Sequence, residues 1–170
     1  MLALGIGLVA GGMVTAAGAW ILSGLLDWIP AAAAAYVVVG SALAVVLRDW
    51  GVLTVPLPQR HWQVPKSVLD QAPPRAALGF GFELGLGFRT YVSASAPYLL
   101  LIALMVLADP LYLYVLVGVG FGIGRFVTAL GRYFGASGEV WGAVIAARGA
   151  LIRSSTAVVA AASVTALAFA

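Results

Sequence analysis

Cysteine is absent from the 170-residue chain. The protein therefore cannot form a disulfide, a thiolate metal site or a dithiol relay. Charged side chains are also scarce: they make up 9% of the residues, against about 25% in a typical soluble domain. Hydrophobic residues make up 63%, and a soluble domain of this size could not keep so much apolar surface away from water. The composition therefore predicts an all-α, polytopic integral membrane protein whose solvent is the lipid bilayer.

Histidine is nearly absent, and the basic residues are not clustered. The single histidine, His61, is too little to build a metal site, and we expect no metal and no other cofactor. The net charge is +3, but no run of basic residues is interleaved with aromatic residues, as a nucleic-acid groove would need. Nucleic-acid binding is therefore not expected. Basic loops that face the cytoplasm account for the charge.

No catalytic constellation is visible in the sequence. Residues 135–138 read Gly-Ala-Ser-Gly and resemble the nucleophile motif of rhomboid intramembrane proteases. Those enzymes take their general base from a histidine on a later helix, whereas His61 precedes the motif. Because no pair of carboxylates shares a helix face either, we do not expect an enzyme.

Five stretches approach or exceed the roughly 20 apolar residues that a helix needs to cross a bilayer. They cover residues 2–26, 30–47, 77–107, 111–131 and 150–170. Residues 48–76 contain five prolines and four Lys or Arg residues, so they are predicted to form a loop. We expect a bundle of five spanning helices that forms a single membrane domain over residues 1–170.

The basic residues also predict an orientation in the cell membrane. Short loops rich in Lys and Arg favour the cytoplasmic side. If loop 48–76 is cytoplasmic, all basic loop residues lie on that side, and Asp27 and Asp109 lie in the outer turns. The N-terminus is then cytoplasmic and the C-terminus lies outside.

The third stretch is too long for one straight crossing. At the helical rise, its 31 residues would measure about 46 Å, against a hydrocarbon core of about 30 Å. Its middle, residues 89–97, is polar, and Pro97 removes a backbone hydrogen bond. We therefore predict a kinked or broken third helix, irregular between Ser93 and Pro97. Its polar atoms must face protein or a water-filled cavity.

Glu83, Arg89 and Arg125 lie deep inside the predicted spans, where charge is costly and indicates a functional site by default. Glu83 and Arg125 each lie about 9 Å from the inner edge at the helical rise, so we predict that they form an ion pair. The pair is either structural or part of a gating or proton-linked device. Arg89 has no carboxylate at its depth, and it either caps loosened backbone or binds an anionic group.

If Arg89 binds a ligand, the solute is small and anionic or zwitterionic. The predicted substrate-binding residues are Arg89, Ser93, Ser95 and Pro97.

Glycines four residues apart occur in three of the predicted helices. Such spacing lets helix backbones approach closely in lipid, where van der Waals contact drives association. The pairs are Gly7/Gly11, Gly81/Gly85, Gly118/Gly122 and Gly120/Gly124. We therefore predict close packing among the helices at 2–26, 77–107 and 111–131.

The glycine-rich run 79–88 and the later Ala96-Pro97-Tyr98 resemble the CcdA/DsbD family of transmembrane thiol-redox carriers. The resemblance covers about a fifth of the chain and implies a broken-helix scaffold. The family has cysteine after its mid-helix proline, where this chain has Tyr98. Electron transfer is therefore not implied.

The leading functional hypothesis is a small transporter-like or permeation protein whose site lies at the broken helix. The alternative is a non-catalytic subunit or assembly factor of a larger membrane complex. In the first case the partners are the lipid bilayer and a solute. In the second case they include other membrane subunits.

Overall fold

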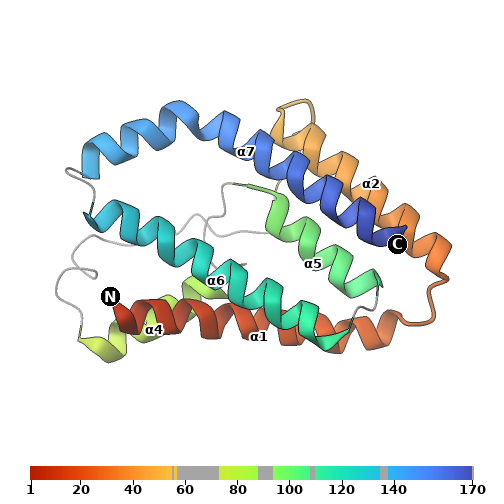
Figure 1. The fold of residues 1–170 in the computed structure, drawn as a ribbon, viewed down its shortest axis with the longest axis horizontal. Helices are drawn as coiled ribbons and strands as arrows, with labels where there is room; N and C mark the ends of the chain where they lie inside the picture. The colour runs from red at the N-terminus through yellow and green to blue at the C-terminus, as the bar shows by residue number, and fades with distance from the viewer. Residues whose placement is uncertain (55, 57–72, 88–93, 108–109, 135–137, 170) are drawn as a thin grey trace. The chain divides into compact units, whose positions relative to one another are not determined.

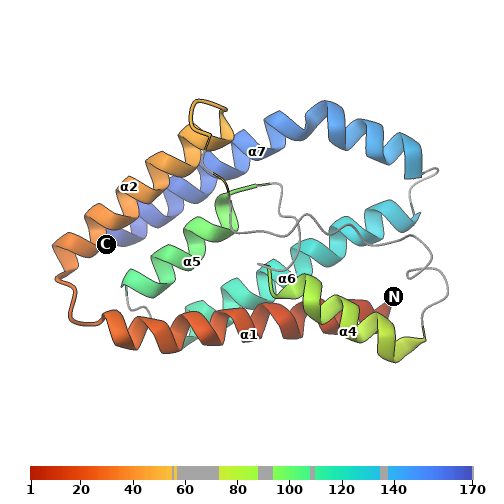
Figure 2. The ribbon, with the colours of Figure 1, turned by 180° about the vertical axis from the view of Figure 1, so that it is seen from behind.

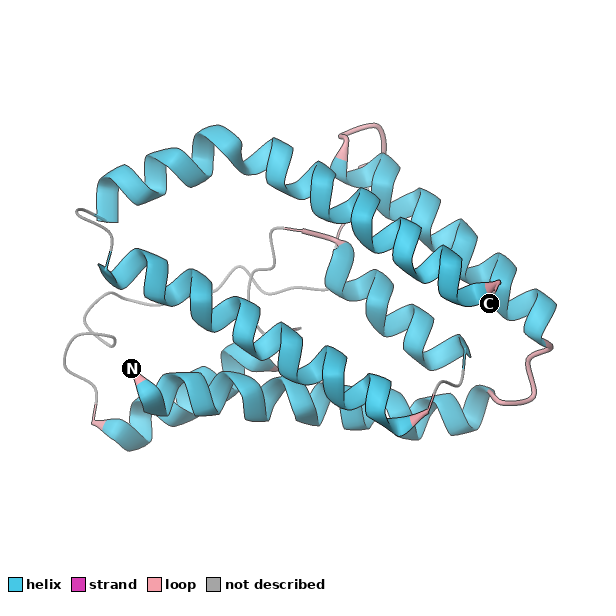
Figure 3. Ribbon diagram, in the orientation of Figure 1, coloured by secondary structure: helices cyan, strands magenta, loops and turns pink. Residues whose placement is uncertain are grey.

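The computed structural model describes residues 1–54, 56, 73–87, 94–107, 110–134 and 138–169. These residues form helices and no strand, which confirms the all-α prediction (Figures 1 and 3). In chain order the helices are α1 (Leu2–Leu26), α2 (Ala31–Asp49), α4 (Pro74–Gly85), α5 (Ala96–Leu107), α6 (Leu111–Phe134) and α7 (Gly138–Ala168).

Four helices of the described chain are long and apolar enough to cross a membrane. They are Leu2–Leu26, Ala31–Asp49, Leu111–Gly131 and Ala147–Ala168. The chain thus has the helices expected of a multi-pass membrane protein.

The predicted third span, residues 77–107, covers α5 and most of α4, which have 12 residues each. Helix α4 begins at Pro74, so the last three residues of the predicted loop 48–76 are helical; proline is tolerated in the first turn of a helix. At the helical rise each of the two helices measures about 18 Å, which is too short to cross a hydrocarbon core of about 30 Å alone. The count of five spanning helices stays a prediction.

The chain divides into two compact units, which are described separately, and α1, α6 and α7 each have residues in both. The first contains residues 1–17, 58–92 and 114–142, and the second contains residues 18–57, 93–113 and 143–170. The single membrane domain over residues 1–170 stays a prediction.

In the first unit, α1 packs against α4 through glycine. A Cβ atom on Gly7 or Gly11 would lie closer than 3.0 Å to the backbone of α4. One on Gly81 or Gly85 would lie equally close to the backbone of α1. No larger residue fits at these four positions without separating the helices, so the predicted close packing is confirmed here.

A second glycine contact joins α1 to α6. A Cβ atom on Gly12, Gly118 or Gly122 would lie closer than 3.0 Å to atoms of the opposite helix. Gly120 and Gly124, by contrast, have open space around them, so the prediction for this pair is wrong. These two glycines lie about 200° around the helix from Gly118 and Gly122 and so occupy a different face.

The contacts also define the helix directions within this unit. Gly7 meets Leu78 and Gly11 meets Gly85, so α1 and α4 run parallel. Gly5 meets Phe126 whereas Gly12 meets Gly118, so α1 and α6 run antiparallel. Two helices are parallel when the chain reverses its direction an even number of times between them. The parallel packing of α1 and α4 agrees with such a topology.

The second unit has a core made by α2, α5 and α7. Five side chains form its centre: Val38, Ala42, Leu99, Ala103 and Val164. Figures 1 and 2 show α5 beside α2, starting at the C-terminal end of α2 and running back along it. In both views α7 lies beside these helices and runs in the direction of α5.

Candidate functional site

The described part of the predicted site lies where α2 ends and α5 begins. Helix α2 continues to Asp49, so Arg48 belongs to its last turn and not to the following loop. Ser95 precedes α5, and its carbonyl oxygen accepts hydrogen bonds from the N–H groups of Tyr98 and Leu99 at 3.0 and 3.2 Å. Ser95 therefore lies at the N-cap position of α5.

Pro97 starts this helix rather than interrupting one. It is the second residue of α5, in the first turn, where backbone N–H groups have no partner within the helix. The missing N–H of proline therefore costs little there, and its restricted φ suits the start of a helix.

Three polar side chains form a hydrogen-bonded cluster at this junction, which we call the Arg48–Asp49–Ser95 cluster. Asp49 Oδ2 accepts a hydrogen bond from the backbone N–H of Ser95 at 3.0 Å. Asp49 Oδ1 accepts one from the Ser95 hydroxyl at 2.6 Å and one from Arg48 Nη1 at 3.0 Å. Arg48 Nη1 also donates to Ser95 Oγ at 2.7 Å.

The three side chains of this cluster are largely buried, so their hydrogen bonds are needed to stabilise the charges. The side chain of Asp49 is 0% exposed and that of Arg48 is 23% exposed, while Ser95 is fully buried. A buried carboxylate is tolerated only with charged or hydrogen-bonding partners, which Arg48 and Ser95 supply. The carboxylate also lies at the positive end of the α5 dipole, and Arg48 lies in the last turn of α2, the negative end. Arg48 is therefore placed favourably at the end of α2, and the α5 N-terminus and Arg48 together offset the cost of an acidic residue in the last turn of α2.

The structure brings together one predicted site residue and two that sequence reasoning missed. Ser95 was predicted to line the site, whereas Arg48 was assigned to a loop and Asp49 had no role. Arg89 and Ser93 lie outside the described residues. The available signal was a single acidic residue at the end of an apolar helix: Asp49 is the only acidic residue in the sequence between Asp27 and Asp70.

Glu83 and Arg125 lie in the first unit, on α4 and α6. Glu83 is exposed and lies between the two glycines of α4 that face α1, on a different side of the helix. Arg125 is partly buried, and its guanidinium carbon lies 5.6 Å from the centre of the Phe121 ring, within range of a cation–π contact. The ion pair between Glu83 and Arg125 stays a prediction.

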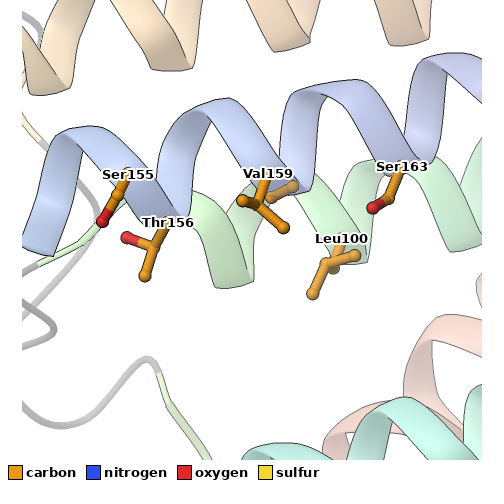
Figure 4. Close-up of a pocket in the computed structure, with 6 residues that line it drawn as sticks. Leu100, Ser155, Thr156, Val159 and Ser163 are labelled. Carbon is orange, nitrogen blue, oxygen red and sulfur yellow. The ribbon is translucent and has the colours of Figure 1, made fainter.

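A groove of about 390 Å³ lies between α5 and α7 in the second unit (Figure 4). Its lining residues are Leu100, Ser155, Thr156, Val159, Ala160 and Ser163. The hydroxyls of Ser155 and Thr156 donate to the carbonyl oxygen of Ile152 at 3.1 and 2.8 Å. These hydrogen bonds within α7 make the groove less polar than its composition implies.

Among the residues that the structure describes, no group of three or more His, Cys, Asp or Glu side chains could hold a metal ion. No protein-family model matches the chain, and no curated protein or solved structure matches it either. The resemblance to the CcdA/DsbD carriers therefore stays a prediction.

Proposed function

We propose that the chain is a small transport or permeation protein of the cell membrane, with its polar path at the interruption between α4 and α5. The observation that supports the proposal is the Arg48–Asp49–Ser95 cluster. Charged side chains buried among membrane helices are costly, and they commonly mark the paths of ions and solutes.

The predicted break in the third span is a second reason. Where a membrane helix is discontinuous, its ends carry backbone groups with no partner inside the helix, and transporters use such ends to bind substrates. Helix α4 ends at Gly85 and α5 begins at Ala96, and Arg89 lies between these two positions in the sequence. A guanidinium group there would pair with the carboxylate of a small anionic or zwitterionic solute.

The hydrogen bonds of Ser95 indicate that it has a structural role in this site. Ser95 is committed to Asp49 and Arg48, so its role in the proposal is to position the start of α5. Solute binding then falls to Arg89 and Ser93.

The proposed topology has five crossings, with α4 and α5 together forming an interrupted third one. Residues 48–76 and the N-terminus face the cytoplasm, and the C-terminus faces outward, because this places the basic loop residues on one side.

The test is solute flux into proteoliposomes that contain the purified full chain. We expect uptake of a radiolabelled amino acid or small carboxylate, and its loss in Arg89→Ala, with no uptake of a cationic analogue. Thr128→Ala is the matched control, since its exposed hydroxyl donates to the Gly124 carbonyl of its own helix. Unchanged flux in Arg89→Ala, or no flux of any solute by the native chain, would contradict the proposal.

A non-catalytic subunit or assembly factor is the second candidate. It is favoured by the complete hydrogen bonding of Ser95 and by the glycine contacts of α1, which suit a rigid structural role. Purification under native conditions distinguishes the two candidates. A membrane polypeptide recovered in a fixed ratio with this chain, together with no flux by the chain alone, would favour the subunit.

A further inference from the structure

One arginine of the second unit has a buried donor that no described residue satisfies. The Nε atom of Arg153 in α7 is buried and has no hydrogen-bond partner in the described chain. A buried guanidinium N–H without an acceptor is costly, so such a group calls for an oxyanion or an ordered water. Asp49, the carboxylate at the end of α2, is already bonded to Arg48 and Ser95.

Arg153 continues the line of side chains that forms the groove between α5 and α7. Residues 153, 156, 160 and 163 follow one another at helical spacings of three and four, so they share one face of α7. The last three of them line the groove, and Leu100 of α5 lines it from the other side (Figure 4). The groove therefore has a cationic residue at the N-terminal end of its helix face and mainly apolar or internally bonded groups along its length.

The dimensions of this line match one leaflet of a bilayer. Positions 153 and 163 are ten residues apart, which corresponds to about 15 Å at the helical rise, or about half of a hydrocarbon core. Arg153 lies six residues inside the candidate span Ala147–Ala168. Helical side chains lean toward the N-terminus, and a long arginine can extend its guanidinium to the headgroup level.

We propose that this groove binds one phospholipid, with the headgroup phosphate on Arg153 and an acyl chain along Leu100, Val159 and Ser163. A phosphate supplies the acceptor that the buried Nε lacks, and an arginine–phosphate contact is charge-assisted. The occupant is a lipid rather than a free phosphate because the groove beyond Arg153 is mainly apolar. The proposed lipid site shares no residue with the Arg48–Asp49–Ser95 cluster. Lipid binding there does not depend on the proposed solute transport.

The test is native mass spectrometry of the full chain in detergent, titrated with palmitoyl-oleoyl phosphatidylglycerol. We expect one tightly bound lipid, and about a tenfold loss of affinity in Arg153→Gln, the size expected for one charge-assisted hydrogen bond. Arg148→Gln is the matched control, because it removes the same charge from an exposed position of the same helix. It should change the affinity less than twofold.

A second pair of variants tests the apolar part of the groove without removing charge. Ser163→Phe fills the groove and should lower lipid affinity, whereas Ala162→Phe, on an exposed position outside the lining, should not. Equal losses in Arg153→Gln and Arg148→Gln, or no effect of Ser163→Phe, would overturn the proposal. Displacement of the lipid by millimolar inorganic phosphate would also overturn it, since that outcome indicates a simple anion site.

Discussion

Removing the Asp49 carboxylate is the most direct test of the junction between α2 and α5. The Asp49→Ala variant takes away the acceptor of three hydrogen bonds, two from Ser95 and one from Arg48. It leaves the Ser95 backbone N–H buried without its partner and Arg48 without its carboxylate. The variant should fold less stably, with α5 loosened at its start.

The size of the loss follows from burial. Removing one partner of a buried ion pair typically costs about 3–5 kcal/mol. Water reaches part of Arg48, whose side chain is 23% exposed, so the lower end of that range, about 3 kcal/mol, is expected. Asp49→Asn keeps one acceptor oxygen and should cost about half as much, because only part of the hydrogen bonding is lost.

The assay is equilibrium unfolding in mixed dodecyl maltoside and sodium dodecyl sulfate micelles, followed by circular dichroism. Asp27→Ala is the control: it removes the same side chain from an exposed position and should change the free energy of unfolding by about 0.5 kcal/mol or less. The double variant Arg48→Gln/Asp49→Ala should lose less than the sum of the single variants, by about 1–2 kcal/mol. Strict additivity, or equal effects of Asp27→Ala and Asp49→Ala, would refute the reasoning.

Two further predictions concern helix packing and topology. Gly81→Ala should lower the free energy of unfolding by about 1–3 kcal/mol, because the new methyl group overlaps the Leu4 carbonyl of α1, whereas Gly79→Ala, in open space, should raise it by about 0.5 kcal/mol. The same unfolding assay measures both, and equal effects would mean that α1 and α4 do not pack through glycine. Single cysteines at Asp27 and Gln63, in this cysteine-free chain, should react with a membrane-impermeant maleimide from opposite sides of sealed vesicles. Labelling from the same side would show the topology to be wrong.

The sequence alone predicted the helical structure and the close packing of helices through glycine. Apolar runs of about 20 residues have few alternatives to a helix in lipid, because every backbone polar group must be bonded internally. The spacings Gly7/Gly11 and Gly81/Gly85 predicted close packing, and both pairs make it. A spacing of four residues places both glycines on one helix face whatever the surroundings are.

The same spacing did not reveal which face of α6 turns inward. Gly118 and Gly122 contact α1, while Gly120 and Gly124 face open space, although the two pairs are identical in pattern. The choice depends on how the neighbouring helices are placed. Periodicity within α6 carries no information about that placement.

Pro97 and the Arg48–Asp49–Ser95 cluster were decided by tertiary structure alone. A proline predicts that a helix cannot pass unchanged, but whether it interrupts one helix or begins the next depends on where the hydrogen bonds start, which is at Ser95. Asp49 and Ser95 are 46 residues apart, and nothing local to either specifies the other. They meet because α5 packs antiparallel to α2, which brings a buried carboxylate to the N-terminal end of α5, where its charge is compensated.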